Sequence, residues 1–258
     1  MTTDATSRFT TRPDPLALRP QAAQEEALAR LHYAVDNRLK LVLLFGPPGC
    51  GKTFVLQSFA AQLRPRATAV AYSCLLGLEP RELAWSLLSQ WGRRPEGTED
   101  AAKLWRELRD QLVELRYEAR PTAVLLDNLD AASPETMLFV QRLANADPAA
   151  DSPLTMIGTL DWLSRSRLPK RLLDQADLRI DLEPWNPDET TAYLNAAEEP
   201  APQFAGDAAA RVHDLTDGLP RRINQLARLA VIAAEGQGLS AIDAEMIEAV
   251  QNELGLRR

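Results

Sequence analysis

Residues 40–53 read KLVLLFGPPGCGKT, and this stretch decides the fold of the 258-residue chain. Residues 41–45 are all apolar, and such a short run bounded by turn residues predicts a buried strand. Three glycines follow within six residues, and a helical pattern begins at Lys52. A glycine-rich turn between a strand and a helix can surround phosphate groups with main-chain amides, and the positive end of the helix dipole favours an anion there. The stretch therefore predicts a phosphate-binding loop.

The loop GPPGCGKT has the spacing of the P-loop of nucleotide-binding proteins. Its lysine, Lys52, is expected to reach the β- and γ-phosphates of ATP, and Thr53 supplies a hydroxyl that can bind magnesium. At the remaining positions the phosphates would meet main chain rather than side chain. Besides Lys52 and Thr53, the expected binding residues are Gly46, Pro47, Pro48, Gly49, Cys50, Gly51 and Phe54.

Outward from this loop, short β-rich runs alternate with helical patterns up to residue 182. Strands joined by helices pair in parallel, so the sequence predicts an α/β fold with a five-stranded parallel P-loop NTPase sheet flanked by helices. The expected strands are 40–45, 68–73, 122–127, 154–159 and 178–182, and the expected helices are 21–37, 52–63, 80–91, 99–119 and 134–146.

The strand signals stop after Leu182, and four helical patterns follow, which predicts a small all-helical lid domain. Pro184 and Pro187 flank two residues in a segment that suits neither a strand nor a helix interior, so the boundary is expected there. The expected lid helices are 188–198, 205–216, 220–235 and 241–253. The predicted organisation is an extended arm at 1–20, a P-loop ATPase domain at 21–183 and the lid at 184–258.

The run AVLLDNLD ends a predicted central strand in Asp127, where a carboxylate can hold magnesium through water, as Walker B acids do. Asn128 follows at the position where many ATPases of this plan place a glutamate that activates water, and an amide cannot accept that proton. Asn128 could still orient the water. Asp130 and Glu135 remain alternative bases, although each also suits a local role in a turn or a first helical turn. We therefore expect slow hydrolysis.

Thr159 ends the next apolar strand. A polar side chain between Asp127 and the γ-phosphate could sense hydrolysis, and the alternative is a hydroxyl that satisfies backbone groups at a strand end. We expect Thr159 to have the sensing role.

Composition narrows the class of protein. The formal net charge of −7 argues against a surface built mainly for phosphate backbones, although it leaves room for a local basic patch that binds DNA. Two cysteines are too few for a disulfide framework, and the N-terminal residues do not resemble a signal segment, so a cytoplasmic location is expected. The apolar runs are far shorter than the roughly 20 residues that a membrane helix needs, so direct membrane insertion is not expected.

The chain resembles AAA+ ATPases, particularly the branch of bacterial general secretion pathway protein A and related transposition ATPases. The segments that carry the resemblance are RPDP, GPPGCGKT, LLDNLD, LRIDLEPWNPDETTAYL and DGLPRRINQLARLAVIAA.

By this resemblance, DGLPRRIN is similar to the sensor-2 motif of the lid, which would direct Arg221 to the γ-phosphate, with Arg222 as the alternative. The resemblance also implies a ring in which a neighbouring subunit supplies an arginine finger. Arg171 is our choice for the finger among the basic residues before the last strand, which are Arg165, Arg167, Lys170, Arg171 and Arg179.

The leading hypothesis is an ATP- and magnesium-dependent switch with slow hydrolysis that remodels or loads an unknown protein client and forms a homo-oligomer on ATP binding. One alternative is a non-catalytic ATP-binding scaffold, favoured by Asn128. The other is a DNA-dependent ATPase of the transposition-helper type.

Overall fold

The computed structural model describes residues 21–66, 68–146, 153–196 and 202–253, and these form two compact units. The sheet unit consists of Glu26–Pro47 and Lys52–Leu182. The described part of the helical unit consists of residues 21–25, 48–51, 183–196 and 202–253. The extended arm predicted for residues 1–20 lies outside the described residues.

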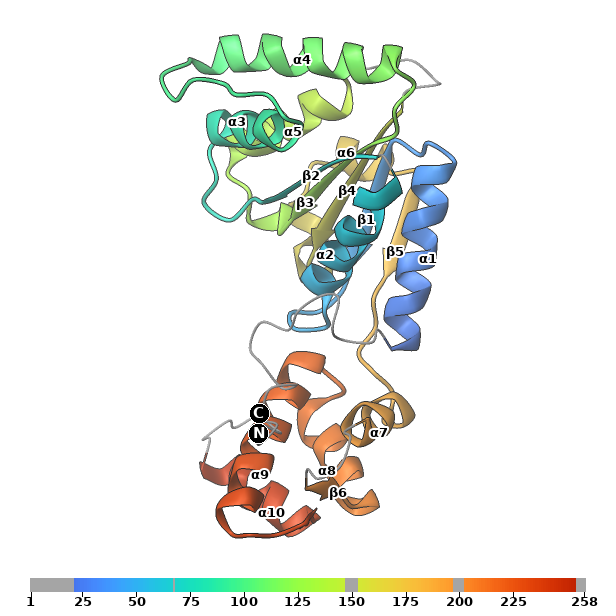
Figure 1. The fold of residues 1–258 in the computed structure, drawn as a ribbon, viewed down its shortest axis with the longest axis vertical. Helices are drawn as coiled ribbons and strands as arrows, with labels where there is room; N and C mark the ends of the chain where they lie inside the picture. Colours follow the sequence, from blue (N-terminus) through green and yellow to red (C-terminus); the bar gives the residue numbers. More distant parts are fainter. Residues whose placement is uncertain (1–20, 67, 147–152, 197–201, 254–258) are drawn as a thin grey trace. The chain divides into compact units, whose positions relative to one another are not determined.

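All five predicted strands are present, and they form one parallel sheet in the order β2-β3-β4-β1-β5 (Figure 1). The strand that leads into the P-loop, β1, therefore lies between β4 and β5. Strand β4 separates it from β3, which ends in Asp127. The strands are β1 Leu41–Phe45, β2 Ala69–Cys74, β3 Thr122–Asp127, β4 Leu154–Leu160 and β5 Leu178–Asp181.

Both faces of the sheet are buried, because helices cover each of them, as is usual for a parallel sheet. Side chains alternate along a strand, and Leu43, Val124 and Leu126 join one apolar cluster with side chains from helices α3, α4 and α5. Leu44 and Leu125 are equally buried on the opposite face. The helices of this part of the chain are α1 Ala22–Asp36, α2 Lys52–Leu63, α3 Pro80–Gln90, α4 Ala101–Tyr117, α5 Pro134–Ala144 and α6 Lys170–Asp174.

Local capping sets the helix ends, and several ends differ from those that hydrophobic periodicity predicted. Helix α4 was expected at 99–119 but begins after Asp100, whose side chain accepts the Lys103 N–H at 2.7 Å. It ends before Ala119, which has a left-handed backbone. Helix α6 and the short 3-10 helices η2 Arg64–Arg66, η3 Leu129–Ala131 and η4 Trp162–Arg167 were not predicted, because they are too short to show a hydrophobic period.

The helical unit contains the four predicted helices, packed around an apolar cluster that includes Trp185, Leu226 and Ile247. The structure adds one feature that was not predicted, a parallel pair of two-residue strands, which are too short for a period of two to be visible. The elements are α7 Pro187–Asn195, β6 Gln203–Phe204, α8 Gly206–Thr216, α9 Pro220–Gly236, β7 Ala241–Ile242 and α10 Ala244–Glu253.

Gly218, within the DGLPRRIN segment, links the turn before α9 to the segment before α7. The Trp185 N–H donates to the Gly218 carbonyl at 2.8 Å. A Cβ atom at Gly218 would lie only 2.1 Å from the Trp185 carbonyl oxygen, and the residue has a φ of +67°. The turn before α9 therefore requires glycine.

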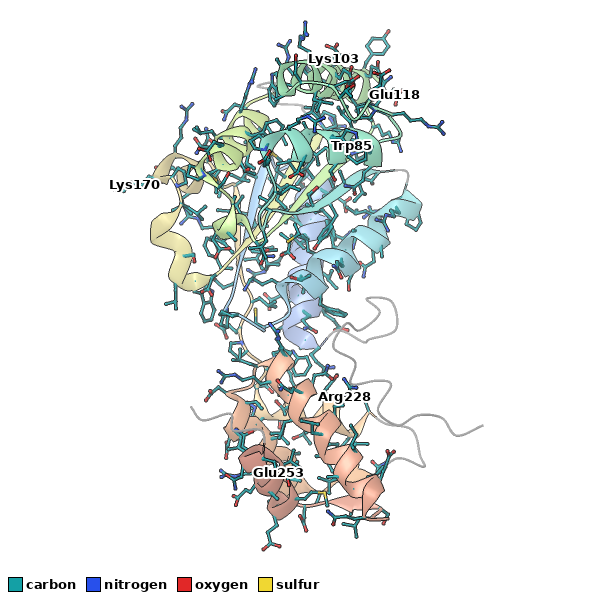
Figure 2. All side chains as sticks on the ribbon, turned by 90° about the vertical axis from the view of Figure 1, so that its left-hand side faces the viewer. Trp85, Lys103, Glu118, Lys170, Arg228 and Glu253 are labelled. Carbon is teal, nitrogen blue, oxygen red and sulfur yellow. The ribbon has the colours of Figure 1, made fainter. Side chains whose placement is uncertain are left out.

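Charged side chains lie on the outside of both units, for example Lys103 and Lys170 in the sheet unit and Glu253 in the helical unit (Figure 2). Within the described ranges, no helix combines the length and the apolar character needed to span a membrane.

Candidate functional site

The glycine-rich loop connects β1 to α2, as predicted. Gly49 has a φ of +87° and Gly51 a φ of +104°, conformations that other residues rarely adopt. The Gly46 N–H donates to the carbonyl of Leu160 at 3.3 Å, which ties the start of the loop to the end of β4. The loop is therefore held at the carboxyl edge of the sheet, where α/β proteins bind ligands.

Lys52 opens helix α2 and turns back over the start of the loop. Its Nζ donates to the carbonyl oxygens of Gly46 at 2.7 Å and Pro47 at 3.0 Å. Among the described residues, no ion pair includes Lys52. The ammonium group is thus positioned by neutral carbonyls, and its charge is available to an anion.

Asp127 is 2% exposed and lies at the centre of a hydroxyl network. Thr53 Oγ1 donates to Asp127 Oδ2 at 2.7 Å, and Thr159 Oγ1 donates to Asp127 Oδ1. Three residues that the sequence singled out separately are therefore in direct contact. They meet because all three lie on the α2 side of the sheet at the carboxyl edge.

Tyr72 is a member of this network that the sequence analysis missed. Its hydroxyl donates to Asp127 Oδ2 at 3.1 Å and accepts from Gln57 Nε2 at 3.4 Å. Burial, followed by the negative charge of Asp127, raises the pKa of Tyr72 to about 12, so the phenol stays protonated and acts as a donor. The strand TAVAYS was recognised, but only the register of β2 against β3 brings Tyr72 beside Asp127.

These residues fit a magnesium ion bound together with a nucleotide. The buried Asp127 carboxylate accepts only from uncharged donors, and no ion pair among the described residues includes it. A buried carboxylate without a cation is costly, so its surroundings favour one. One carboxylate and one threonine hydroxyl are the protein ligands that magnesium typically has beside phosphates.

Asn128 contributes to the network through its main chain. The Asn128 N–H donates to Asp127 Oδ1 at 3.2 Å and to Thr159 Oγ1 at 3.0 Å, and its backbone is left-handed with a φ of 55°. Its side-chain Nδ2 donates to the sulfur of Cys74 at 3.3 Å, at the end of the neighbouring strand β2. The amide is thereby occupied by a partner that the sequence did not suggest.

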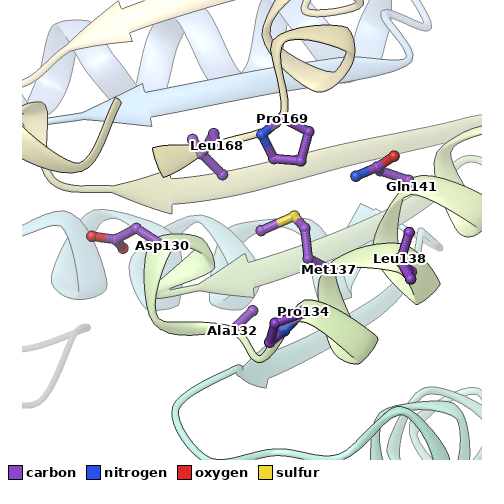
Figure 3. Close-up of a pocket in the computed structure, with 8 residues that line it drawn as sticks. All are labelled: Asp130, Ala132, Pro134, Met137, Leu138, Gln141, Leu168 and Pro169. Carbon is purple, nitrogen blue, oxygen red and sulfur yellow. The ribbon is translucent and has the colours of Figure 1, made fainter. Parts of the chain in front are cut away.

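The two alternative bases lie outside the hydroxyl network. Asp130 Oδ2 accepts the Asp161 N–H at 3.3 Å, and Asp130 lies at one end of a largely apolar pocket of about 380 Å³ with its carboxylate directed away from Met137 (Figure 3). Glu135 is exposed in the first turn of α5, which Ser133 caps. Asp130 thus has a local role in a turn and Glu135 one in a first helical turn, which were the alternatives to a catalytic role.

The arginines predicted as sensor and finger lie in different units. In the helical unit, the Arg221 N–H donates to the Gly49 carbonyl at 3.1 Å, whereas Arg222 Nη1 pairs with Asp217 Oδ2 at 3.2 Å. Arg171 is exposed on α6, which precedes β5 and so belongs to the amino edge of the sheet, opposite the loop.

Comparisons with known proteins show the family of the chain. Residues 36–166 match the family described as AAA domain. The chain is 29% identical over 239 residues to general secretion pathway protein A of Aeromonas hydrophila, a match that covers 89% of this chain. The chain spans 43% of the length of that relative.

Solved structures show the same fold at low sequence identity. The Aeropyrum pernix ORC1 protein in complex with DNA is 19% identical with a TM-score of 0.74, covering 96% of this chain and 69% of that one. Cdc6p from Pyrobaculum aerophilum is 17% identical with a TM-score of 0.73, covering 98% of this chain and 71% of that one. The Thermotoga maritima RuvB Holliday junction branch migration motor is 17% identical with a TM-score of 0.63, covering 92% of this chain and 70% of that one. From the P-loop, the Asp127 strand and the matched family, the chain belongs to the AAA domain family of P-loop ATPases.

Proposed function

We propose that this chain is a magnesium-dependent ATPase that hydrolyses ATP slowly and acts as a nucleotide-dependent switch on a protein client. The observation that carries the proposal is the buried Asp127 carboxylate, which Thr53 and Thr159 contact directly at the same edge of the sheet as the P-loop. Its charge and that of Lys52 lack side-chain counterions among the described residues, and a magnesium nucleotide would supply both.

In this proposal, each side chain of the network has a distinct task. Lys52 binds the β- and γ-phosphates, and Thr53 and Asp127 hold magnesium. Bound magnesium would neutralise the charge that develops on the phosphates during transfer. Thr159 contacts Asp127 and Asn128 together, so it is suited to report a change at the γ-phosphate to both.

Slow hydrolysis is proposed because this network lacks a carboxylate that could act as base at position 128. Asn128 donates its side-chain amide to Cys74, and an amide has no proton affinity comparable with that of glutamate. The lone pair of its carbonyl oxygen can still orient a water molecule, which supports slow rather than absent turnover.

We also propose that residues 21–183 act as the ATPase domain and 184–258 as a lid that carries the sensor arginine. Arg221 is preferred over Arg222, because Arg222 already pairs with Asp217. An arginine at the start of a helix opposes the helix dipole, so Arg221 calls for an anion. A cytoplasmic location is part of the same proposal.

The oligomer is proposed from the resemblance to AAA+ ATPases, and DNA is considered because of one structural neighbour. We propose a homo-oligomer on ATP binding, with Arg171 as the arginine that a neighbouring subunit presents. DNA is a weaker proposal: the ORC1 structure contains DNA, but the charge of −7 disfavours a general polyanion surface.

Thermal unfolding tests the nucleotide site. ATP with magnesium at about 100 times its dissociation constant should stabilise the protein by about 2.7 kcal/mol, and Lys52→Ala should abolish that shift. Lys103→Ala is the matched control, because Lys103 lies on the surface of α4 and should leave the shift unchanged. Equal stabilisation of wild type and Lys52→Ala would refute the site.

A non-catalytic ATP-binding scaffold is the second candidate function, favoured by the Asn128–Cys74 hydrogen bond. Turnover in a single-turnover assay separates the two, because a scaffold would bind ATP with magnesium and release it unchanged. Repeating the assay with duplex DNA tests the DNA-dependent alternative, for which turnover should rise.

A further inference from the structure

Three arginines from three separate helices line one pocket of the sheet unit. They are Arg109 on α4, Arg142 on α5 and Arg171 on α6, and the pocket has a volume of about 520 Å³. The remaining lining residues are Trp105, Gln141, Asn145 and Ala146. Among the described residues that line this pocket, the titratable side chains are all arginines.

These arginines are also without acidic partners in the part of the chain that the structure describes. Other surface arginines form ion pairs there: Arg30 with Glu26, Arg66 with Asp36 and Arg93 with Glu114. The ion pairs between described residues do not include Arg109, Arg142 or Arg171. The chain has seven more acidic than basic residues, so three converging arginines that no described carboxylate pairs with favour an anion from outside.

The pocket is held in shape by contacts that leave its guanidinium groups available. The Arg142 guanidinium lies 3.9 Å from the ring centroid of Trp105, which is 5% exposed and packs edge-on against Phe139. Stacking on an indole fixes a guanidinium while its in-plane N–H groups stay free to bind oxygen.

Two further residues of the pocket, Gln141 and Asn145, are also held by hydrogen bonds. Asn145 Nδ2 donates to the Gln141 carbonyl at 2.7 Å, and Asn145 Oδ1 accepts from Gln175 Nε2 at 3.3 Å. These bonds join the end of α5 to α6, so Arg142 and Arg171 are presented by linked elements. A preorganised site loses less entropy on binding.

We propose that this pocket binds a compact polyanion with two or more phosphate groups. Arginine forks match phosphate oxygens in a bidentate manner, and several phosphates are needed to engage three guanidinium groups. A compact ligand is favoured over a nucleic-acid backbone, because the adjoining surface of α4 carries Glu107 and Asp110 beside its basic residues rather than a continuous basic stripe.

This site is separate from the P-loop and gives Arg171 a ligand within its own subunit. The pocket residues lie on α4, α5 and α6 and in the two residues that follow α5, and none belongs to the network around Asp127. If Arg171 acts as a finger, replacing it should reduce hydrolysis by the assembled protein. If it acts in the pocket, replacing it should reduce phosphate binding by a chain whose P-loop is disabled.

Calorimetry with inorganic triphosphate, without magnesium, tests the proposal in the full chain carrying Lys52→Ala. We expect one binding site, and we expect Arg142→Gln or Arg109→Gln added to Lys52→Ala to weaken it by about tenfold or more. Arg106→Gln is the matched control, because Arg106 is exposed on the same helix α4 and does not line the pocket. Melting curves should confirm that each variant remains folded.

The proposal fails if triphosphate does not bind, or if Arg142→Gln and Arg109→Gln bind it as tightly as their parent. It fails equally if Arg106→Gln weakens binding as much as they do, since the effect would then be one of general charge. Binding of duplex DNA without binding of triphosphate would also overturn it, because the site would then serve an extended backbone.

Discussion

The Asp127 carboxylate owes its geometry to three hydroxyl donors and one main-chain N–H. Thr53 and Tyr72 donate to Oδ2, whereas Thr159 and the Asn128 N–H donate to Oδ1. Both oxygens are therefore oriented without a bound metal. Uncharged donors hold the carboxylate without cancelling its charge. A cation would therefore gain the full electrostatic benefit of a buried anion.

Removing the phenol hydroxyl of Tyr72 should weaken magnesium binding. Tyr72→Phe keeps the ring in place but removes one donor to Asp127 Oδ2, and such supporting contacts are typically worth about tenfold in metal affinity. Magnesium titrations of the ATP-dependent thermal shift measure the effect. Tyr117→Phe is the control, because Tyr117 is 93% exposed. Identical midpoints for both variants would show that Tyr72 only fills space.

Asn128→Glu should accelerate hydrolysis. A positioned general base is typically worth about 10² to 10⁴ in rate. The gain should be smaller here, because the left-handed backbone at position 128 suits asparagine better than glutamate and the side chain must leave Cys74. Single-turnover hydrolysis measures the chemical step, with binding checked separately. Asn128→Gln, which adds length without charge, is the control.

A contrary result at position 128 would redirect the search for the base. If the wild-type protein turns over rapidly and Asn128→Glu slows it, then Asn128 already positions the water well. Asp130 or Glu135 would then need to approach the nucleotide, although neither belongs to the Asp127 network in this structure.

Strand β4 supports the site through a glycine. A Cβ atom at Gly158 would lie 2.8 Å from Leu129 Cδ2 and 3.5 Å from Leu43 Cδ2. The absence of a side chain therefore lets Leu129, one residue after Asn128, pack closely on the sheet. The packing of η3 against β4 thus anchors the chain that follows Asp127.

Gly158→Ala should destabilise the protein by about 1–3 kcal/mol, the usual cost of overpacking a core. Urea denaturation measures the change in the free energy of unfolding. Gly97→Ala is the control, since a Cβ atom there meets nothing within 4 Å, and its effect should stay within about 0.5 kcal/mol. A neutral result at position 158 would mean that Leu129 can shift without cost.

Within the described residues, each of the two units has a hydrophobic core of its own. The chain passes from one unit to the other after residues 25, 47, 51 and 182, so the glycine-rich loop contributes residues 48–51 to the helical unit. The proposed switch would act through these connections, because each core can remain intact while a connection changes.

Nucleotide should promote self-association of the whole molecule. A slow-hydrolysing ATP analogue with magnesium should increase the mass measured by light scattering, because a neighbouring arginine such as Arg171 would gain a γ-phosphate as partner. ADP should give a smaller effect, and Lys52→Ala should give none. A monomer at high concentration with the analogue would contradict the proposed ring.

The sequence by itself determined the P-loop, the parallel sheet, the helical C-terminal part and the strand that ends in Asp127. These follow from local patterns, since glycine spacing and hydrophobic periods depend on residues near each other in the chain. The same locality explains why helix α4 was recognised although its ends were misplaced by two residues on each side.

Only the tertiary structure decided which side chains meet. Tyr72 contacts Asp127 because β2 pairs with β3 in one register, and a shift by one residue would turn the phenol to the other face. Asn128 donates to Cys74 for the same reason. Arg109, Arg142 and Arg171 converge only because the fold brings α4, α5 and α6 together. Contacts of this kind depend on distances between segments far apart in sequence, and no local pattern encodes those distances.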